Sequence, residues 1–197
     1  MSKNRLEAFS DGVLAIIITI MVLNIEIPQG AGWAMLRPVL PIFLSYVISF
    51  LFIGIYWGNH HNLFHTVKNI DSTIILANLN LLFWLSLLPL ATGWMGENQF
   101  APSTIVVYAL VSLLSGLSYT ILQRIILKRT LNDSPLRLAI QKQTPKTIAS
   151  TLCCLAAIPL AFVSPILSCS LFILQSAIWI IPDKNVERAL ENEQVGN

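Results

Sequence analysis

Residues 5–28 read RLEAFSDGVLAIIITIMVLNIEIP. A charged and polar turn at residues 5–12 runs directly into residues 13–25, which are almost wholly apolar. A helix needs roughly 20 residues to cross the bilayer core, and the two parts together reach that length. Pro28 ends the segment, because a proline interrupts the hydrogen bonds of a helix interior. The stretch therefore predicts a transmembrane helix over residues 5–27.

Helical geometry divides this segment into two faces. At 100° per residue, one narrow aliphatic row lies within about 60° of the helix circumference. Its members are Ile16, Ile20, Leu23 and Ile27. Thr19 lies at the edge of this row, and Asp11 lies on the opposite side. Lipid does not sort apolar residues by side, so the pattern leaves open which face meets lipid. An ionisable group near the hydrocarbon is costly unless it is paired, and we expect Asp11 to have a partner within the protein.

The composition is that of a membrane protein. Of 197 residues, 55% are hydrophobic and 11% are charged, whereas an average soluble domain has about 25% charged residues. We expect an all-α membrane protein in which residues 1–197 form a single domain without any soluble unit. The six expected transmembrane helices span residues 5–27, 38–66, 73–94, 104–127, 148–163 and 166–181.

The polar segments between these spans indicate the orientation. Residues 128–147 are the only extended polar stretch and are predicted to form a loop, and residues 183–197 are predicted to form a polar tail. With six spans, nearly all lysine and arginine residues fall on one side of the membrane and only Arg37 on the other. Because cytoplasmic segments are rich in these residues, the loop, the tail and both termini are predicted to be cytoplasmic.

Several short motifs resemble a known family. An R-x-x-x-F-S-D pattern opens the first predicted helix and is made of Arg5, Phe9, Ser10 and Asp11. This pattern resembles the signature of the lysosomal potassium channel family, transmembrane protein 175, and of its small prokaryotic relatives. Two further groups are similar to what the family shows at the same places. They are Trp57, His60, His61, Leu63 and Phe64 in the second span, and Asn80, Pro89, Thr92 and Glu97 around the third.

The resemblance implies a homotetramer in which the first helix of each subunit lines a central pore. Such channels have stacked aliphatic rings at their narrowest point, and no T-V-G-Y-G filter loop occurs in this chain. For this chain, the resemblance implies that Ile16 forms the constriction and that Ile20 and Leu23 form further rings toward the outside. Thr19 adds hydroxyls that favour potassium, the more easily dehydrated cation, to a moderate degree. On the residues alone, the plain interpretation is that the same row packs in a helix core.

Polar residues are expected at the outer mouth and around Asp11. Asn24 and Glu26 are expected to raise the local cation concentration, with headgroup anchoring as the alternative for Glu26. For Arg5, Ser10 and Asp11 the alternatives are ion ligation and a structural role, and the structural role is favoured. A structural network is expected to fix the first helix against its neighbours. Its members are Arg5, Phe9, Ser10, Asp11, Trp57, His60, His61, Asn78 and Asn80. Within it, the candidate donors to Asp11 are His60, His61, Asn78 and Asn80, with Trp57 packed beside them.

The histidines raise the question of a metal site. His61 and His65 are four residues apart and share one helical face, but neither an H-E-x-x-H glutamate nor a convincing third ligand accompanies them. No metal site is therefore expected. A pH-sensing role for His60, His61 and His65 is favoured over metal binding, because imidazole titrates near neutral pH.

The expected function is that of a moderately potassium-selective cation channel, and not of an enzyme. Its expected partners are further copies of the chain, potassium and other monovalent cations, and the lipid bilayer, with no cofactor and no nucleic acid. The alternative is a secondary transporter or a proton leak pathway, although the chain shows neither inverted repeats nor broken helices. The single short unit is similar to the prokaryotic branch of the family, which favours the plasma membrane as its location.

Overall fold

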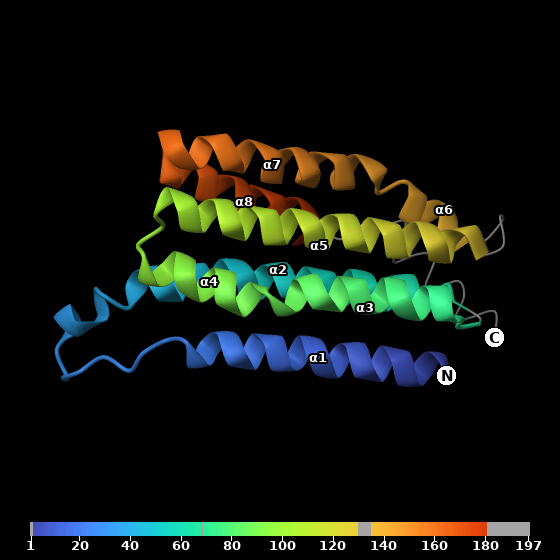
Figure 1. The fold of residues 1–197 in the computed structure, drawn as a ribbon, viewed down its shortest axis with the longest axis horizontal. Helices are drawn as coiled ribbons and strands as arrows, with labels where there is room; N and C mark the ends of the chain where they lie inside the picture. The colour runs from blue at the N-terminus through green and yellow to red at the C-terminus, as the bar shows by residue number, and fades with distance from the viewer. Residues whose placement is uncertain (1, 68, 130–134, 181–197) are drawn as a thin grey trace.

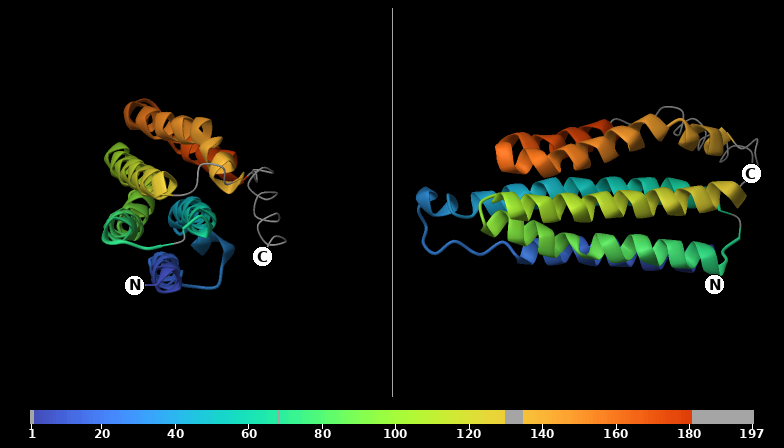
Figure 2. Two further views of the ribbon diagram at one scale, coloured as in Figure 1. Left: turned by 90° about the vertical axis from the view of Figure 1, so that its right-hand side faces the viewer. Right: turned by 45° about the horizontal axis from the view of Figure 1, so that its top comes forward.

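The computed structural model describes residues 2–67, 69–129 and 135–180, and in these ranges the chain forms one bundle of helices running side by side (Figure 1). Its elements are α1 (Lys3–Leu23), the short 3-10 helix η1 (Trp33–Leu36), α2 (Leu40–His65), α3 (Ser72–Ser86), α4 (Leu88–Glu97), α5 (Pro102–Arg129), α6 (Pro135–Gln141), α7 (Thr144–Val163) and α8 (Pro165–Ile180). Viewed along the bundle, α1 lies at one edge, and α7 and α8 lie at the opposite edge (Figure 2).

The lengths of the helices fit a protein with six transmembrane helices. In the part of the chain that is described, five segments are long and apolar enough to cross a membrane, namely Lys3–Leu23, Leu40–His65, Ser72–Glu97, Pro102–Arg129 and Arg137–Val163. α8 is apolar but has only 16 residues. At 1.5 Å per residue it rises about 24 Å, which covers most of a hydrocarbon core roughly 30 Å thick. The chain is thus an all-helical, multi-pass membrane protein.

α1 is shorter at its C-terminal end than the sequence predicts. It ends at Leu23, and residues 25–28 are not helical, so Ile27 does not continue the aliphatic row as the prediction over residues 5–27 required. The side-chain amide of Asn24 donates a hydrogen bond to the backbone carbonyl of Pro89 in α4, at 3.3 Å. This contact fixes the chain to α4 immediately beyond the helix, four residues before Pro28.

The third predicted span is divided into two helices. The sequence predicts one helix over residues 73–94 with a kink at Pro89, whereas the structure has α3 and α4 separated at Leu87. Pro89 has no N–H to bond the carbonyl four residues earlier, and its ring crowds that carbonyl, so the disturbance falls on the turn before the proline. At the other end, the Asp71 carboxylate caps α3 by accepting a bond from the N–H of Ile74 at 3.0 Å.

The predicted cytoplasmic loop at residues 128–147 is mostly helical where it is described. α5 continues to Arg129, α6 occupies Pro135–Gln141, and α7 begins at Thr144. Composition suggested a loop because lysine, glutamine and proline are frequent there, but Pro135 and Pro145 stand in the first turns of α6 and α7, where proline is tolerated. The predicted tail at residues 183–197, and the last residue of the sixth predicted span, lie outside the described residues.

Two close contacts hold α2, α4 and α5 together. In the bundle interior, the hydroxyl of Ser49 lies 2.7 Å from that of Thr92 and 3.1 Å from that of Tyr108, so that a chain of hydroxyls joins the three helices. Nearer the end of α4, the space beside Gly96 is so narrow that an added Cβ would lie 2.6 Å from the Cα of Ile42. Glycine lets two membrane helices approach closely at such a point.

Candidate functional site

α1 has one face buried against the bundle and one face without a neighbour in the described chain. The helix packs against α2, α3 and α4, and its buried residues recur every three or four positions. They are Leu6, Ser10, Leu14, Ile17 and Met21. On the other face, the side chains of Ile16, Ile20 and Leu23 are 58%, 45% and 80% exposed. The aliphatic row is therefore not a packing stripe of the subunit core.

The polar residues predicted beside the constriction and at the outer mouth differ in their surroundings. Thr19 is exposed beside Ile16 and donates its hydroxyl hydrogen to the carbonyl of Ile16 at 2.9 Å, which leaves the lone pairs of the hydroxyl oxygen available. Glu26 is exposed in the segment after α1. Asn24 lies against α4 instead, because its amide is bonded to Pro89 and touches the space beside Gly93. The amide N–H group of Asn24 that makes this bond is thus not available at an open mouth.

A buried chain of polar groups joins α1, α3 and α2. The hydroxyl of Ser10 donates to the carbonyl of Leu6 at 2.9 Å and accepts a bond from the amide nitrogen of Asn78 at 2.9 Å. The amide oxygen of Asn78 lies 2.8 Å from Nε2 of His60. Because an amide oxygen only accepts, Nε2 of His60 is the donor of this bond.

The buried chain leaves one nitrogen unsatisfied. Nδ1 of His60 is buried and has no hydrogen-bond partner in the described part of the chain. The His60 ring stacks on Phe64, with 4.3 Å between the ring centroids. With Nε2 protonated, Nδ1 of the neutral ring is a bare acceptor, which is costly to bury without a donor.

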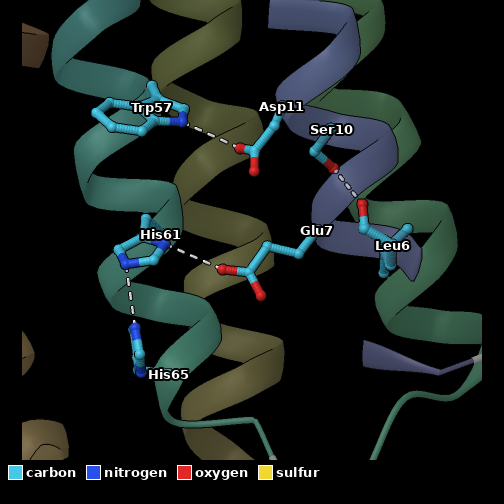
Figure 3. A network of polar contacts seen from close by, with 7 residues as sticks. All are labelled: Leu6, Glu7, Ser10, Asp11, Trp57, His61 and His65. Atoms are coloured by element: carbon cyan, nitrogen blue, oxygen red, sulfur yellow. Dashed lines mark hydrogen bonds and ion pairs between the residues drawn. The ribbon is translucent and has the colours of Figure 1, made fainter. Parts of the chain in front are cut away.

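Asp11 is paired with a residue that was not among its predicted donors. The indole nitrogen of Trp57 donates to the Asp11 carboxylate at 3.1 Å (Figure 3). The predicted donors have other partners: His60 and Asn78 bond each other, and the amide of Asn80 donates to Ser118 of α5 at 2.7 Å. The buried chain lies on the α3 side of α1, whereas Asp11 is on the α2 side, and that separation is the physical reason for the difference.

A second pairing lies one helical turn from the first. Glu7 precedes Asp11 by four residues, and His61 follows Trp57 by four, so antiparallel α1 and α2 bring both pairs into register (Figure 3). Nδ1 of His61 is 3.1 Å from a carboxylate oxygen of Glu7, and Nε2 of His61 is 3.1 Å from Nε2 of His65. Glu7 was not among the residues predicted from the sequence, although its spacing from Asp11 matches the spacing of Trp57 from His61.

The remaining predicted network residues lie at the surface of the subunit. Arg5 and Phe9 are exposed, and Phe9 is 52% exposed, on the face of α1 that also carries Ile16. The expected single network is thus divided into four hydrogen-bonded groups: the buried chain, the Asp11 pair, the Glu7 pair and the bond from Asn80 to Ser118. Among the described residues, no group of three or more His, Cys, Asp or Glu side chains is arranged to hold a metal ion.

Comparisons with known sequences and structures find similar proteins that are described as potassium or proton channels. A sequence model of the family described as the endosomal/lysosomal potassium channel TMEM175 matches residues 5–89, which contain most of α1, all of α2 and α3, and the first residues of α4. A protein of Chryseobacterium sp. that is named a potassium channel is 47% identical over 191 residues, covering 97% of this chain and 99% of that protein.

Two further similarities concern a solved structure and a mammalian protein. The crystal structure of a lysosomal potassium-selective channel TMEM175 homolog from Chamaesiphon minutus superposes with a TM-score of 0.73 and 26% identity, covering 92% of this chain and 98% of that one. The endosomal/lysosomal proton channel TMEM175 of Mus musculus is 39% identical over 103 residues, which are 46% of this chain and 21% of the mouse protein.

Proposed function

The chain belongs to the TMEM175 potassium channel family, and from this premise we propose that four copies of it form a moderately potassium-selective cation channel lined by α1. The observation that carries the proposal is the free face of α1, on which Ile16, Ile20 and Leu23 are exposed while the opposite face is buried. A helix at the edge of its own bundle can meet three copies of itself about a central axis (Figure 2). One copy alone cannot enclose a pore, whereas a closed symmetric ring can.

The aliphatic row gives this pore its narrowest part. Four Ile16 side chains form one ring, and four Ile20 side chains form a second about 6 Å further along the axis. Such rings offer a cation no oxygen ligand, and in a narrow state they exclude water and block ions. The Thr19 hydroxyls supply oxygen atoms beside the Ile16 ring and partly compensate for lost hydration. Potassium, which is more weakly hydrated than sodium, is therefore favoured to a moderate degree.

Ile16→Asn tests this arrangement in single-channel recordings from purified protein in planar bilayers. Replacing four aliphatic side chains by four amides makes the ring polar, so we expect larger sodium currents and a reduced shift in reversal potential between potassium and sodium. Leu152→Asn is the matched control, because Leu152 is an exposed apolar residue on α7 at the opposite edge of the bundle. Unchanged selectivity in Ile16→Asn, or equal changes in both variants, contradicts the proposed constriction.

The same recordings separate the channel from a secondary transporter. Discrete unitary currents that follow the electrochemical gradient of potassium belong to a channel. Flux that saturates at low substrate concentration and stops without a coupled ion gradient belongs to a transporter.

Proton permeation is the second candidate function. It is favoured by the mouse relative, which is named a proton channel, and by the buried chain of Ser10, Asn78 and His60 beside α1. Liposomes that contain the purified protein and a pH-sensitive dye test it. Acidification driven by a potassium gradient, and lost in His60→Phe without loss of potassium current, supports a proton pathway separate from the pore.

The proposed location is the plasma membrane, with both termini in the cytoplasm. The basic residues Lys3, Arg5 and Arg129 stand at the end of the bundle where α1 begins and α5 ends, and Arg37 precedes α2 at the other end. The prevalence of positive charge in cytoplasmic segments supports this orientation. Labelling of single cysteines at Asn4 and Gly32, in a background without the native cysteines, tests it. Outside labelling of the Asn4 position reverses the assignment.

A further inference from the structure

We propose that His61 and His65 bind one transition-metal ion of the Zn²⁺ class, and that Glu7 of α1 orients the His61 ring for this purpose. The two histidines are one turn apart at the C-terminal end of α2, and both side chains are exposed. Glu7 approaches them from the first turns of the antiparallel α1 (Figure 3). The site lies outside the free face of α1, and metal binding does not depend on ion conduction.

The two ring nitrogens already lie near the separation that a metal requires. Nε2 of His61 and Nε2 of His65 are 3.1 Å apart, and the rings meet edge to face with 4.6 Å between centroids. Zn–N bonds of about 2.0–2.1 Å in tetrahedral geometry place two nitrogens about 3.3–3.4 Å apart. A widening of a few tenths of an ångström therefore brings the two nitrogens to the separation that one ion needs.

Glu7 sets the tautomer that coordination needs. Its carboxylate oxygen is 3.1 Å from Nδ1 of His61, so Nδ1 carries the hydrogen and donates it to the carboxylate. In the neutral ring, Nε2 then presents its lone pair toward His65. A carboxylate behind a ligating imidazole is the usual outer partner in zinc sites, where it fixes the ring and raises its basicity. The H-x-x-x-H pair has no such carboxylate in its own helix, and α1 supplies it.

The donor set determines the class of ion. Imidazole nitrogens select zinc, copper or nickel over magnesium and calcium, which prefer oxygen ligands. Since the described residues offer no third protein ligand, water molecules complete the coordination. When the ion binds both rings, it replaces the hydrogen bond between Nε2 of His61 and Nε2 of His65. The bond between Glu7 and Nδ1 of His61 remains in place. The ion thereby strengthens the link between the start of α1 and the end of α2.

Calorimetric titration of Zn²⁺ into the purified full-length protein in detergent micelles, without a polyhistidine tag, tests the site. We expect one ion per chain, loss of binding in His61→Asn and in His65→Asn, and a 10- to 100-fold weaker affinity in Glu7→Gln. Glu97→Gln, which removes an exposed carboxylate at the far end of the bundle, should leave the affinity unchanged. Co²⁺ should give a visible absorption band that disappears in the histidine variants.

Thermal unfolding separates lost binding from lost folding. His65→Asn, which keeps the bond between Glu7 and His61, should match the wild type in EDTA. Zn²⁺ should raise the unfolding midpoint of the wild type but not that of either histidine variant. The site is refuted if the wild-type protein does not bind Zn²⁺, or if both histidine variants bind as the wild type does. An unchanged affinity in Glu7→Gln refutes the role of Glu7. A protein that binds Zn²⁺ but carries no current refutes the proposed channel and leaves the metal site standing.

Discussion

Replacing Asn78 by leucine should destabilise the protein, and replacing His60 by phenylalanine as well should restore part of the loss. Asn78 is fully buried and joins Ser10 of α1 to His60 of α2. Asn78→Leu leaves the Nε2–H group of His60 buried without an acceptor, which costs roughly 1–3 kcal/mol. It also removes the interhelical bond to Ser10, for which membrane proteins give about 0.6–1.7 kcal/mol. The expected total is about 2–4 kcal/mol.

His60→Phe removes the orphaned donor together with the unsatisfied Nδ1 atom. The phenyl ring keeps the stacking on Phe64, whose centroid lies 4.3 Å from that of the histidine ring. Replacing both partners of a buried hydrogen bond by apolar groups is far less costly than replacing one. Asn78→Leu/His60→Phe should therefore be more stable than Asn78→Leu by about 1–3 kcal/mol.

The four proteins of this cycle can be compared by denaturant unfolding in micelles, followed by tryptophan fluorescence at fixed protein and detergent concentration. Asn80→Leu provides the matched control, because Asn80 bonds Ser118 on α5 and has no bond to His60. Its effect should add to that of His60→Phe within about 0.5 kcal/mol. Additive effects of Asn78→Leu and His60→Phe, to within the same margin, would refute the assignment of the Nε2–H bond.

Two further substitutions probe the packing of α1 and α4. Asp11→Ala should reduce the amount of folded, assembled channel more than it changes ion preference, because it removes the acceptor of the Trp57 hydrogen bond, whereas Asp11→Asn keeps an oxygen there. Gel filtration measures assembly, and reversal potentials measure ion preference. Normal assembly with a reversed potassium preference argues against a structural role. Gly96→Ala should lower stability by about 1–3 kcal/mol, because the new Cβ would lie 2.6 Å from the Cα of Ile42. Gly54→Ala is the control, because a Cβ at Gly54 meets no atom within 4 Å. Equal thermal unfolding midpoints of the two alanine variants would contradict this prediction.

The sequence predicts the elements of this fold better than their ends. Long apolar runs indicate the helices because each must satisfy its backbone groups within itself in lipid. The end of α1 at Leu23 depends on the bond from Asn24 to a carbonyl 65 positions along the chain, which no local pattern reveals. A kink was predicted at Pro89, but the helix is interrupted at Leu87, because proline disturbs the turn that precedes it.

The sequence distinguishes the two faces of α1 but not the pairing of its polar residues. Helical periodicity places the aliphatic row of Ile16 and the Asp11 carboxylate on different sides of the helix. In the structure the aliphatic row is exposed, and Asp11 lies beside α2. Which donor reaches Asp11 depends on the register between α1 and α2, which periodicity within one helix does not contain. Once that register is known, the four-residue spacing on both helices assigns Trp57 to Asp11 and His61 to Glu7.

The interruption at Leu87 has a mechanical consequence for α1. One anchor of α1, the bond between Ser10 and Asn78, lies on α3, and the other, the bond between Asn24 and Pro89, lies on α4. The two anchors therefore lie on either side of the interruption at Leu87. A change in the angle between α3 and α4 would therefore change the tilt of α1 relative to the rest of the bundle.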